Sequence, residues 1–353
     1  MNLTIKDVAA RAGVSTATVS RVLNDHSDVA AHLREAVRNA ITELGYRPNG
    51  PARSLRTRTT LTIGVVISDV TNTFFTSMVR GVEDAAQEAG YSVQLANTDE
   101  DPEKEIRQLE IAAAEQLAGI ILSPTSSTSA NHEMLGLRGM PIVTVDRRLR
   151  GARIDSVTTT NRRAAFEATE HLIDQGCRRI GMIAGPSNVT TGAHRQSGYK
   201  SALKARQIEL DNALIVTSNF RMDGGYQAAK YLLQLANRPD ALLVSNSLMT
   251  IGALEAIKEA DLRIPEDIAL VAFDDVDWAN ALRAPLTVIA QPAYEVGRTA
   301  ARLLLNRIRH RESPIQHAIL PATLKIRQSS LKGGVAQYKS SIGTDKPDLS
   351  NWA

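Results

Sequence analysis

Polar and aromatic side chains recur directly after short apolar runs along residues 61–291. The run VVIS leads into DVTNTFF, VTV leads into DRR, and VIA leads into QP. Carboxylate, guanidinium and carboxamide groups bind hydroxyl groups through planar, paired hydrogen bonds, and aromatic rings cover the apolar faces of a sugar. The pattern therefore predicts a site for a small polyhydroxylated molecule. Its candidate residues are Asn72, Phe74, Phe75, Asp146, Arg147, Thr191, Arg195, Phe220, Asn246, Asp274, Trp278 and Gln291.

These apolar runs alternate with helical patterns, and the alternation positions the candidate residues. Helices are expected at about Thr76–Ala89, Gly198–Arg206 and Ala293–Arg309. Alternation of strands and helices implies parallel sheets with helices on both faces. The series restarts near residue 161, which predicts two lobes with a ligand at the carboxyl ends of the strands. A single Asp after a strand is more often a turn residue, but recurrence at seven strand ends favours binding.

A separate all-helical segment is predicted at the N-terminus. Apolar residues repeat at helical spacing over 5–12, 16–23 and 33–44, with Ser15 as the cap of the second stretch and Gly13 as the end of the first. Two helices joined by a turn of about four residues, the second with short polar side chains outward, describe a helix-turn-helix. A three-helix bundle that binds protein is the alternative.

The charge is distributed unevenly along the chain. Residues 1–60 carry nine Lys and Arg against five Asp and Glu, a balance of +4, whereas the whole chain is +3. A small basic segment on a nearly neutral body favours nucleic-acid binding, although charge alone also fits a solvated surface. The helix-turn-helix pattern decides for DNA.

The stretch TIKDVAARAGVSTATVSRVLN, followed by ELGYRPN and ARSL, resembles the head of the LacI/GalR family of bacterial transcription repressors, and the resemblance continues to about residue 330. It implies an N-terminal all-α helix-turn-helix head and a periplasmic-binding-protein-like body of two doubly wound parallel α/β lobes. It also implies a transcriptional repressor that binds palindromic double-stranded operator DNA as a homodimer. A small sugar or sugar derivative would act as the effector that releases it.

The same resemblance assigns DNA contacts. Thr16, Ala17 and Arg21 would read bases in the major groove, with Ser15 and Thr18 near phosphates. Leu55 would be a minor-groove wedge on a short helix that folds only on DNA, and a disordered linker is the alternative for that segment. The complete set is Thr4, Ser15, Thr16, Ala17, Thr18, Ser20, Arg21, Asn24, Tyr46, Arg53, Leu55 and Arg56.

For the body, the candidate residues are similar to the pocket of ribose-type sugar-binding proteins. The resemblance implies that Phe74 and Phe75 cover the sugar from one lobe and Phe220 from the other. It implies hydroxyl contacts from Asp146, Arg147, Arg195, Asn246, Asp274 and Gln291. Val189 disfavours a purine effector, and the pair Arg147–Arg148 would admit a sugar acid or a sugar phosphate.

Four segments are expected along the chain. They are a head over 1–47, a hinge helix or linker over 48–60, an effector-binding and dimerisation core over 61–333, and a flexible tail over 334–353. Within the core, an N-lobe is expected at about 61–160 and 292–320, and a C-lobe at about 161–291 and 321–333.

Other function classes find little support. The sequence has no GxGxxG, GxxxxGK[ST], GxSxG or HExxH, and its seven histidines never stand at metal-ligand spacing, so no enzyme, metal or cofactor is expected. One cysteine, and the lack of a long apolar run, favour a cytoplasmic, nucleoid-associated protein without a membrane partner. The alternatives are a cytoplasmic sugar-binding protein, or a regulator that uses its sugar as corepressor or activator.

Overall fold

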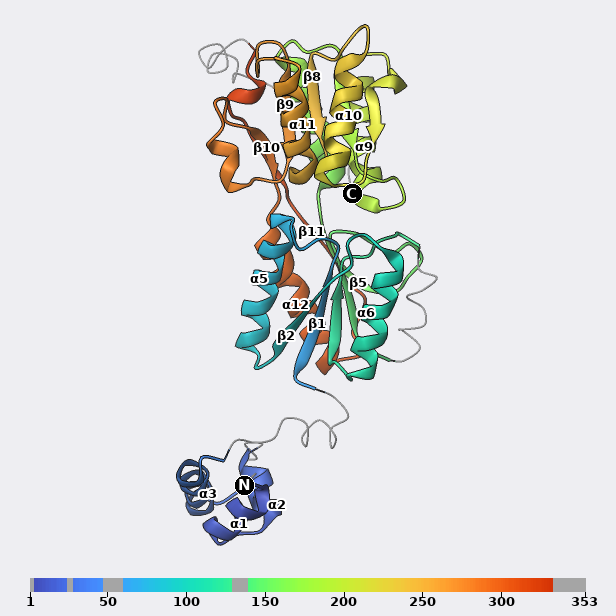
Figure 1. Cartoon of the computed structure of the whole chain (residues 1–353). Helices are drawn as coiled ribbons and strands as arrows, with labels where there is room; N and C mark the ends of the chain where they lie inside the picture. The colour runs from blue at the N-terminus through green and yellow to red at the C-terminus, as the bar shows by residue number, and fades with distance from the viewer. Residues whose placement is uncertain (1–2, 24–27, 47–59, 129–138, 333–353) are drawn as a thin grey trace, which may run out of the picture. The chain divides into compact units, whose positions relative to one another are not determined.

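The computed structural model describes residues 3–23, 28–46, 60–128 and 139–332 (Figure 1). Contacts between residues divide the chain into two compact units, 1–60 and 61–353, and each is described by itself below.

The first unit contains three helices, α1 (Ile5–Ala12), α2 (Thr16–Leu23) and α3 (Ala31–Leu44). The predicted ends of α1 and α3 are confirmed, because Gly13 and Gly45 adopt left-handed backbone angles with φ of 66° and 60°.

The turn and the apolar residues between the helices hold the head together. The hydroxyl of Ser15 accepts the backbone N–H of Thr18 at 3.1 Å, which confirms Ser15 as the cap of α2. Val8, Val19 and Val37, one from each helix, are fully buried against one another. The predicted helix-turn-helix is therefore present, with its three apolar stripes facing one small core.

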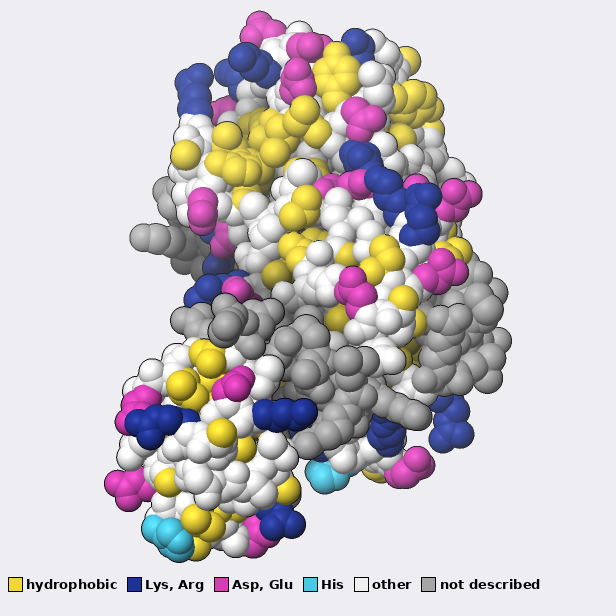
Figure 2. All heavy atoms as spheres, turned by 60° about the horizontal axis from the view of Figure 1, so that its bottom comes forward, with side chains coloured by type: hydrophobic (Ala, Val, Ile, Leu, Met, Phe, Trp, Pro, Cys, Tyr) yellow, Lys and Arg dark blue, Asp and Glu magenta, His cyan; other side chains and the backbone are white. Residues whose placement is uncertain are grey.

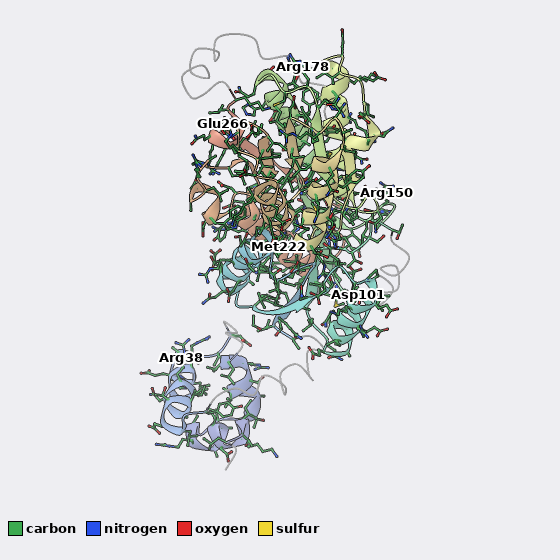
Figure 3. All side chains as sticks on the ribbon, turned by 45° about the horizontal axis from the view of Figure 1, so that its top comes forward. Arg38, Asp101, Arg150, Arg178, Met222 and Glu266 are labelled. Carbon is green, nitrogen blue, oxygen red and sulfur yellow. The ribbon has the colours of Figure 1, made fainter. Side chains whose placement is uncertain are left out.

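The first lobe of the second unit, the N-lobe, is built on a parallel six-stranded sheet in the order β11-β5-β4-β3-β1-β2. Its strands are β1 (Thr62–Ile67), β2 (Ser92–Asn97), β3 (Gly119–Leu122), β4 (Ile142–Val145), β5 (Asp155–Thr159) and β11 (His317–Leu320). The described helices of this lobe are α5 (Thr73–Glu88), α6 (Pro102–Ala114) and α12 (Ala293–Arg309). The carboxylate of Asp101 caps α6 and is visible at its start in Figure 3.

The C-lobe repeats this plan in a sheet of order β12-β10-β9-β8-β6-β7. Its strands are β6 (Ile180–Ala184), β7 (Ile215–Thr217), β8 (Ala241–Val244), β9 (Ala269–Phe273), β10 (Thr287–Ala290) and β12 (Thr323–Lys325). Its helices are α8 (Asn161–Asp174), α9 (Thr190–Ala205), α10 (Met222–Gln234) and α11 (Ser247–Glu259), with short 3-10 turns η1 (Asn212–Leu214), η2 (Asp277–Asn280) and η3 (Gln328–Ser330).

The predicted body of two doubly wound sheets is confirmed, with three differences in detail. Strand β12 runs antiparallel to β10, because the chain leaves β11 at the cleft and enters the C-lobe at the carboxyl ends of its strands. Strands β5, β11 and β12 carry no long apolar run and were not predicted. Helix α9 begins at Thr190 instead of near Gly198, so Thr191 and Arg195 lie on a helix and not in a loop.

The chain passes between the two lobes at three places, which lie side by side in Figure 1. The passages follow β5, β10 and β11. Thr160 ties two of them together: its N–H donates to the Leu320 carbonyl at 3.1 Å, and its hydroxyl accepts from the Ala322 N–H at 2.9 Å. The hydroxyl of Thr159 donates to Gln291 Oε1 at 2.6 Å and ties in the third. The three passages therefore form one hydrogen-bonded hinge.

Helices α5 and α12 cross at two glycines. A Cβ atom on Gly297 would lie 1.9 Å from the Met78 carbonyl oxygen, and one on Gly81 would lie 2.0 Å from the Tyr294 carbonyl oxygen. Real Cβ atoms do not approach backbone so closely, so the two helix backbones are in direct contact. The hydroxyl of Tyr294 also donates to Asp84 Oδ2 at 3.0 Å across the same crossing.

Replacing Gly297 by alanine should lower the stability of the body by about 1–3 kcal/mol, because the added methyl group overpacks a backbone contact. Thermal unfolding followed by circular dichroism measures the effect. Arg302→Ala, an exposed change on the same helix, should stay within about 0.5 kcal/mol of the parent. Equal melting temperatures for Gly297→Ala and the parent would contradict the close crossing.

A buried histidine anchors the last described turn, η3, to the C-lobe. His171 Nε2 lies 2.7 Å from Ser330 Oγ, which lies 2.7 Å from Thr287 Oγ1 at the start of β10. Burial lowers the pKa of His171 to about 4, from an ordinary value of 6.5. Asp174 opposes this shift only weakly. The ring is therefore neutral in the folded protein at neutral pH.

This shift sets a direction for the pH dependence of stability. Between pH 6.5 and 4 the unfolded chain binds a proton that folded His171 does not, so stability falls as the pH falls through that window. The loss from pH 7 to pH 5 should be about 2 kcal/mol from this group. Urea unfolding at pH 7 and pH 5 measures this loss of stability. In His171→Gln the loss between the two pH values should be smaller by about the same amount. An unchanged pH dependence in that variant would contradict the assignment.

Candidate functional site

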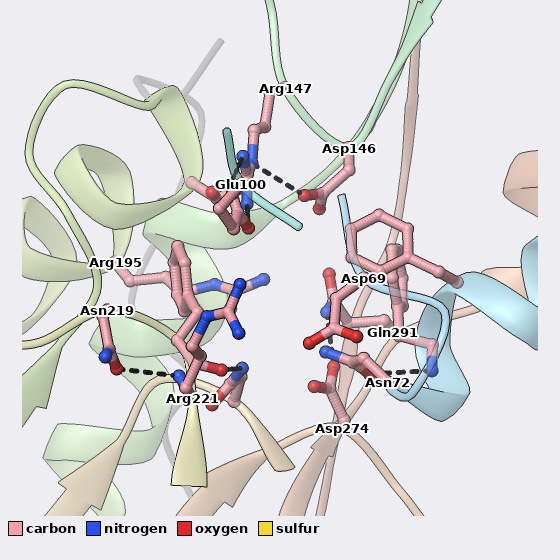
Figure 4. A pocket seen from close by; sticks show the side chains of 15 residues that line it. Asp69, Asn72, Glu100, Asp146, Arg147, Arg195, Asn219, Arg221, Asp274 and Gln291 are labelled. Atoms are coloured by element: carbon pink, nitrogen blue, oxygen red, sulfur yellow. Dashed lines mark hydrogen bonds and ion pairs between the residues drawn. The ribbon is translucent and has the colours of Figure 1, made fainter. Parts of the chain in front are cut away.

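A cavity lies between the lobes at the carboxyl ends of both sheets (Figure 4). Its volume, counted with its open mouth, is about 430 Å³. Both sheets deliver strand ends to it, as expected for ligand sites in open α/β folds. The lining residues are Asp69, Asn72, Phe74, Phe75, Glu100, Asp146, Arg147, Thr191, Arg195, Asn219, Phe220, Arg221, Asn246, Asp274 and Gln291.

Two carboxylates occupy equivalent places in the two lobes. Asp146 follows β4 and Asp274 follows β9, which hold the same position in their sheets. Each donates its N–H at 3.0 Å to the neighbouring strand, to Val157 and Ile289 respectively, and each has a positive φ, 62° and 76°. The duplicated fold therefore delivers one carboxylate from each lobe to the same cavity.

Unusual backbone angles are concentrated at this cavity. Among the described residues, eight residues other than glycine have a positive φ, and four of these line the cavity. Such angles cost about 1–3 kcal/mol each and persist where the surrounding structure enforces them, often at functional sites. The four are Glu100, Asp146, Phe220 and Asp274.

Asp274 joins the cavity to the hinge. Its Oδ1 accepts a hydrogen bond from Gln291 Nε2 at 2.7 Å, and its Oδ2 accepts from the Ser247 N–H at 3.2 Å. Gln291 in turn accepts from Thr159 in the hinge. A ligand that binds Asp274 or Gln291 would therefore contact the same hydrogen-bond chain that connects the lobes.

Arg195 is a buried cation held on one side only. Its Nε donates to Asn161 Oδ1 at 2.6 Å, its Nη1 donates to the Ser245 carbonyl, and its guanidinium lies 4.0 Å from the centre of the Phe273 ring. Burial lowers the pKa of Arg195, and the charges of Asp274 and Asp146 oppose that shift. These contacts orient the guanidinium beside the cavity.

Arg147 has the opposite electrostatic setting. Burial opposes its charge, but the charge and hydrogen bonds of Glu100 raise the pKa of Arg147 overall. Burial also raises the pKa of Asp146, although the neighbouring Arg147 works against that rise. The Nε of Arg147 lies 3.5 Å from Asp146 Oδ2.

Aromatic rings form two walls of the cavity. Phe74 and Phe75, at the start of α5, meet edge to face with their centroids 5.3 Å apart. Phe220 comes from the C-lobe, and its ring lies 5.5 Å from the Arg147 guanidinium carbon. The cavity thus combines flat apolar walls with polar groups around them.

Two buried polar atoms at the cavity, Thr191 Oγ1 and Arg147 Nε, have no hydrogen-bond partner in the structure, although both residues are only 2% exposed. Nε of Arg147 still faces the Asp146 carboxylate as an ion pair, so of these two only Thr191 Oγ1 is without a polar partner. Buried polar groups are nearly always satisfied in proteins, and an unpaired one costs about 1–3 kcal/mol. A polar ligand would supply the missing partner of Thr191.

Eleven of the twelve residues predicted for the sugar site line this cavity. Trp278 does not: it lies in η2 and packs, partly buried, on the C-lobe core. Four lining residues were not among the twelve predicted, namely Asp69, Glu100, Asn219 and Arg221. Asp69 lies in the loop after β1, and the other three come from the loops after β2 and β7.

Most of the predicted DNA-contact residues that the structure describes lie on or beside α2, whereas Thr4 caps α1 and Tyr46 follows α3. Thr4, Ser15, Thr16, Ala17 and Arg21 are exposed, whereas Thr18 and Ser20 are half-buried. Tyr46 packs partly against the core of the head. Figure 2 shows Lys and Arg side chains spread over the visible surface of the head. Asn24, Arg53, Leu55 and Arg56 lie outside the described residues.

The residues that the structure describes contain no group of three or more His, Cys, Asp or Glu that would hold a metal ion. None of their helices is both long and apolar enough to cross a membrane.

Comparison with known proteins identifies both units. Residues 4–49 match the model of bacterial regulatory proteins of the lacI family, and residues 169–330 match a periplasmic binding protein-like domain. The ribose operon repressor of Halalkalibacterium halodurans is 36% identical over 331 residues, which is 94% of this chain and 98% of that protein.

Solved structures agree in fold. The lac repressor dimer bound to operator and the anti-inducer ONPF superimposes with a TM-score of 0.82 at 28% identity, covering 94% of this chain and all of that one. A LacI family transcriptional regulator from Enterococcus faecium with bound ribose gives a TM-score of 0.68 at 29% identity, covering 76% of this chain and 98% of that one.

Proposed function

The chain belongs to the LacI family of bacterial regulatory proteins, and on this premise we propose that it is a repressor whose effector is ribose. The family consists of DNA-binding transcriptional regulators with small-molecule effectors. In our proposal a homodimer binds a palindromic operator through two heads, and ribose bound between the lobes releases it.

The presence of one carboxylate from each lobe, Asp146 and Asp274, is the observation that favours a neutral sugar as the effector. Asp146 and Asp274 reach one cavity from equivalent strand ends, and the charges of both act on the buried guanidinium of Arg195. A carboxylate accepts hydrogen bonds from adjacent hydroxyls, while a guanidinium donates to a ring or hydroxyl oxygen. A molecule with hydroxyls on several sides satisfies both kinds of group.

The walls of the cavity support a sugar ring. Phe74 and Phe220 bring aromatic rings to the cavity from opposite lobes. The similar protein from Enterococcus faecium has bound ribose, and the relative from Halalkalibacterium halodurans is named a ribose operon repressor. These similarities favour ribose among monosaccharides.

For the head, exposure of small residues at the start of α2 supports base reading by that helix. Thr16 and Ala17 leave room for a close approach to base edges, and Arg21 lies one turn further on with an exposed guanidinium. We assign Thr16, Ala17 and Arg21 to bases and Ser15 and Thr18 to phosphates. The protein acts in this proposal by binding alone, in the cytoplasm, without catalysis.

The test begins with DNA selection. Full-length protein is used to select duplexes from a random-sequence library, and the selected consensus should be an inverted repeat. Calorimetry with D-ribose, D-xylose, D-glucose and ribitol then measures sugar affinity, and fluorescence anisotropy measures operator affinity with and without each sugar. Ribose should bind with the highest affinity and weaken operator binding about tenfold or more, the range of allosteric coupling energies of 1–3 kcal/mol.

Each contrary result points to a different part of the proposal. Tighter operator binding with ribose would make the sugar a corepressor. Selection of no DNA consensus would leave a sugar-binding protein without a regulatory head. Absence of ribose binding, with a selected palindrome, would keep the regulator and reject the effector.

A further inference from the structure

Three guanidinium groups line the cavity, those of Arg147, Arg195 and Arg221. Clustered arginines commonly bind phosphate, because their forked donors match its oxygens. A cavity lined by three arginines would bind a phosphorylated sugar unless other protein groups already accept the hydrogen bonds of those arginines. The groups that each guanidinium already binds therefore determine which sugars the cavity accepts.

The carboxylate of Glu100 binds both terminal nitrogens of the Arg147 guanidinium. Nη1 of Arg147 donates to Oε2 of Glu100 at 2.6 Å, and Nη2 donates to Oε1 at 2.5 Å, so both carboxylate oxygens are engaged. Nη1 also donates to the Pro124 carbonyl at 3.1 Å. The side chain of Arg147 is 3% exposed and that of Glu100 is 21% exposed. This is a shielded, bidentate pair, in which Arg147 keeps little capacity for an incoming anion.

The backbone of the loop after β2 fixes Glu100 in this position. Asp99 and Glu100 are consecutive residues with positive φ, 54° and 60°. The N–H of Glu100 donates to the Ser68 carbonyl at 3.1 Å, and the Asp99 carboxylate accepts from Asn97 Nδ2 at 2.7 Å and also pairs with Lys104. The turn is thus held from several sides, and it directs the Glu100 side chain to Arg147.

The same turn engages a second arginine of the cavity from the other lobe. Nη2 of Arg221, which precedes α10, donates to the Asp99 carbonyl at 2.6 Å. Figure 4 shows Arg221 and Arg195 on one side of the cavity and Asp69, Asp274 and Gln291 on the other. The Asp99–Glu100 turn therefore occupies donors of two of the three arginines.

The charges along the cavity give the same result. Four carboxylates, from Asp69, Glu100, Asp146 and Asp274, face three guanidinium groups, an excess of one negative charge. A sugar phosphate would bring a charge of about −1.5 to −2 at neutral pH. Without Glu100 the net charge of the lining would be zero, and the terminal nitrogens of Arg147 would be free to bind an anion.

We propose that Glu100 is a specificity-determining residue, which makes the cavity accept neutral sugars and reject their phosphorylated forms. The inference rests on the proposed sugar-binding function of this cavity. It also argues against the expectation that Arg147 and Arg148 together admit a sugar acid or phosphate, because Arg148 is not part of the lining and both terminal nitrogens of Arg147 bind Glu100.

The test compares full-length parent protein with Glu100→Gln, which keeps the size of the side chain and removes its charge. Glu103→Gln is the matched control, because Glu103 is an exposed glutamate three residues further along. Calorimetry in phosphate-free buffer measures the dissociation constants of D-ribose, D-ribose 5-phosphate and inorganic phosphate. Glu100→Ala gives the same readout if the glutamine variant does not fold.

In the parent and in Glu103→Gln, ribose 5-phosphate should bind much more weakly than ribose. Glu100→Gln should narrow this preference about tenfold or more and bind inorganic phosphate about tenfold more tightly than the parent. An unchanged preference in Glu100→Gln, or equal narrowing in Glu103→Gln, would overturn the proposal. If the parent binds no ribose, the proposed effector fails, and the phosphate affinities still decide the role of Glu100: equal values in parent and variant reject it.

Discussion

Replacing Asp274 by alanine should weaken ribose binding about 100-fold or more and leave operator affinity without sugar unchanged. The carboxylate is 6% exposed and belongs to the wall of the cavity, so the variant loses a charge-assisted hydrogen bond to the ligand. It also removes a negative charge near Arg195, which burial already disfavours as a cation. Leaving such a buried charge uncompensated costs about 3–5 kcal/mol.

The neighbouring carboxylate is the natural control for this experiment. Asp275 is exposed, pairs with Lys325 and Arg327 on the return segment, and does not line the cavity. Asp275→Ala should therefore keep ribose affinity within about threefold of the parent, since its carboxylate does not reach the ligand site. Calorimetry gives the affinities, and anisotropy gives the operator response. A ribose-responsive Asp274→Ala protein would place the effector elsewhere.

Replacing Arg21 by alanine should cost about 1–3 kcal/mol of operator binding and relax discrimination at one base pair in each half-site. Arg21 is exposed on α2, one turn after Thr16 and Ala17, and the part of the chain described here shows no carboxylate paired with it. Binding to a set of operators with single base changes distinguishes a base contact from a phosphate contact, because a phosphate contact contributes equally on every sequence.

Lys6→Ala serves as the control for charge. Lys6 is exposed on α1 and carries the same charge as Arg21, so any loss it causes should be uniform across operator variants. A uniform loss in Arg21→Ala would make that residue a phosphate contact.

A chain that starts at Leu61 should keep ribose binding and lose operator binding, because the head and the body are separate compact units that divide at this residue.

Local patterns were sufficient to predict the elements with strong periodicity. The apolar spacing of the head predicted α1 and α3 with their glycine ends, and buried strands such as β4 and β9 stood out as continuous apolar runs. The polar residue that follows such a run was expected at the carboxyl end of its strand, where ligands bind in parallel α/β sheets. For that reason Asp146 and Asp274 could be predicted as lining residues of one cavity.

Contacts that depend on distant segments could not be predicted in this way. Strands β11 and β12 alternate exposed and half-buried residues, and only the completed sheets give them partners. Glu100 and Arg147 are 47 positions apart and meet because β2 and β4 end at the same edge. Trp278 does not line the cavity for a related reason: the chain turns through η2 after Asp274 and packs the partly buried indole against the C-lobe core.

The order in which the lobes are completed affects synthesis of the protein. Helix α12, which covers α5 and the N-lobe sheet, begins at Ala293, after every helix of the C-lobe has been translated. At about 5–20 residues per second, roughly ten seconds pass between the end of β5 and the start of α12. Throughout that time the part of α5 that packs on α12 has no cover, and exposed apolar surface of this kind favours chaperone binding and aggregation. A chain truncated within the C-lobe would complete neither lobe.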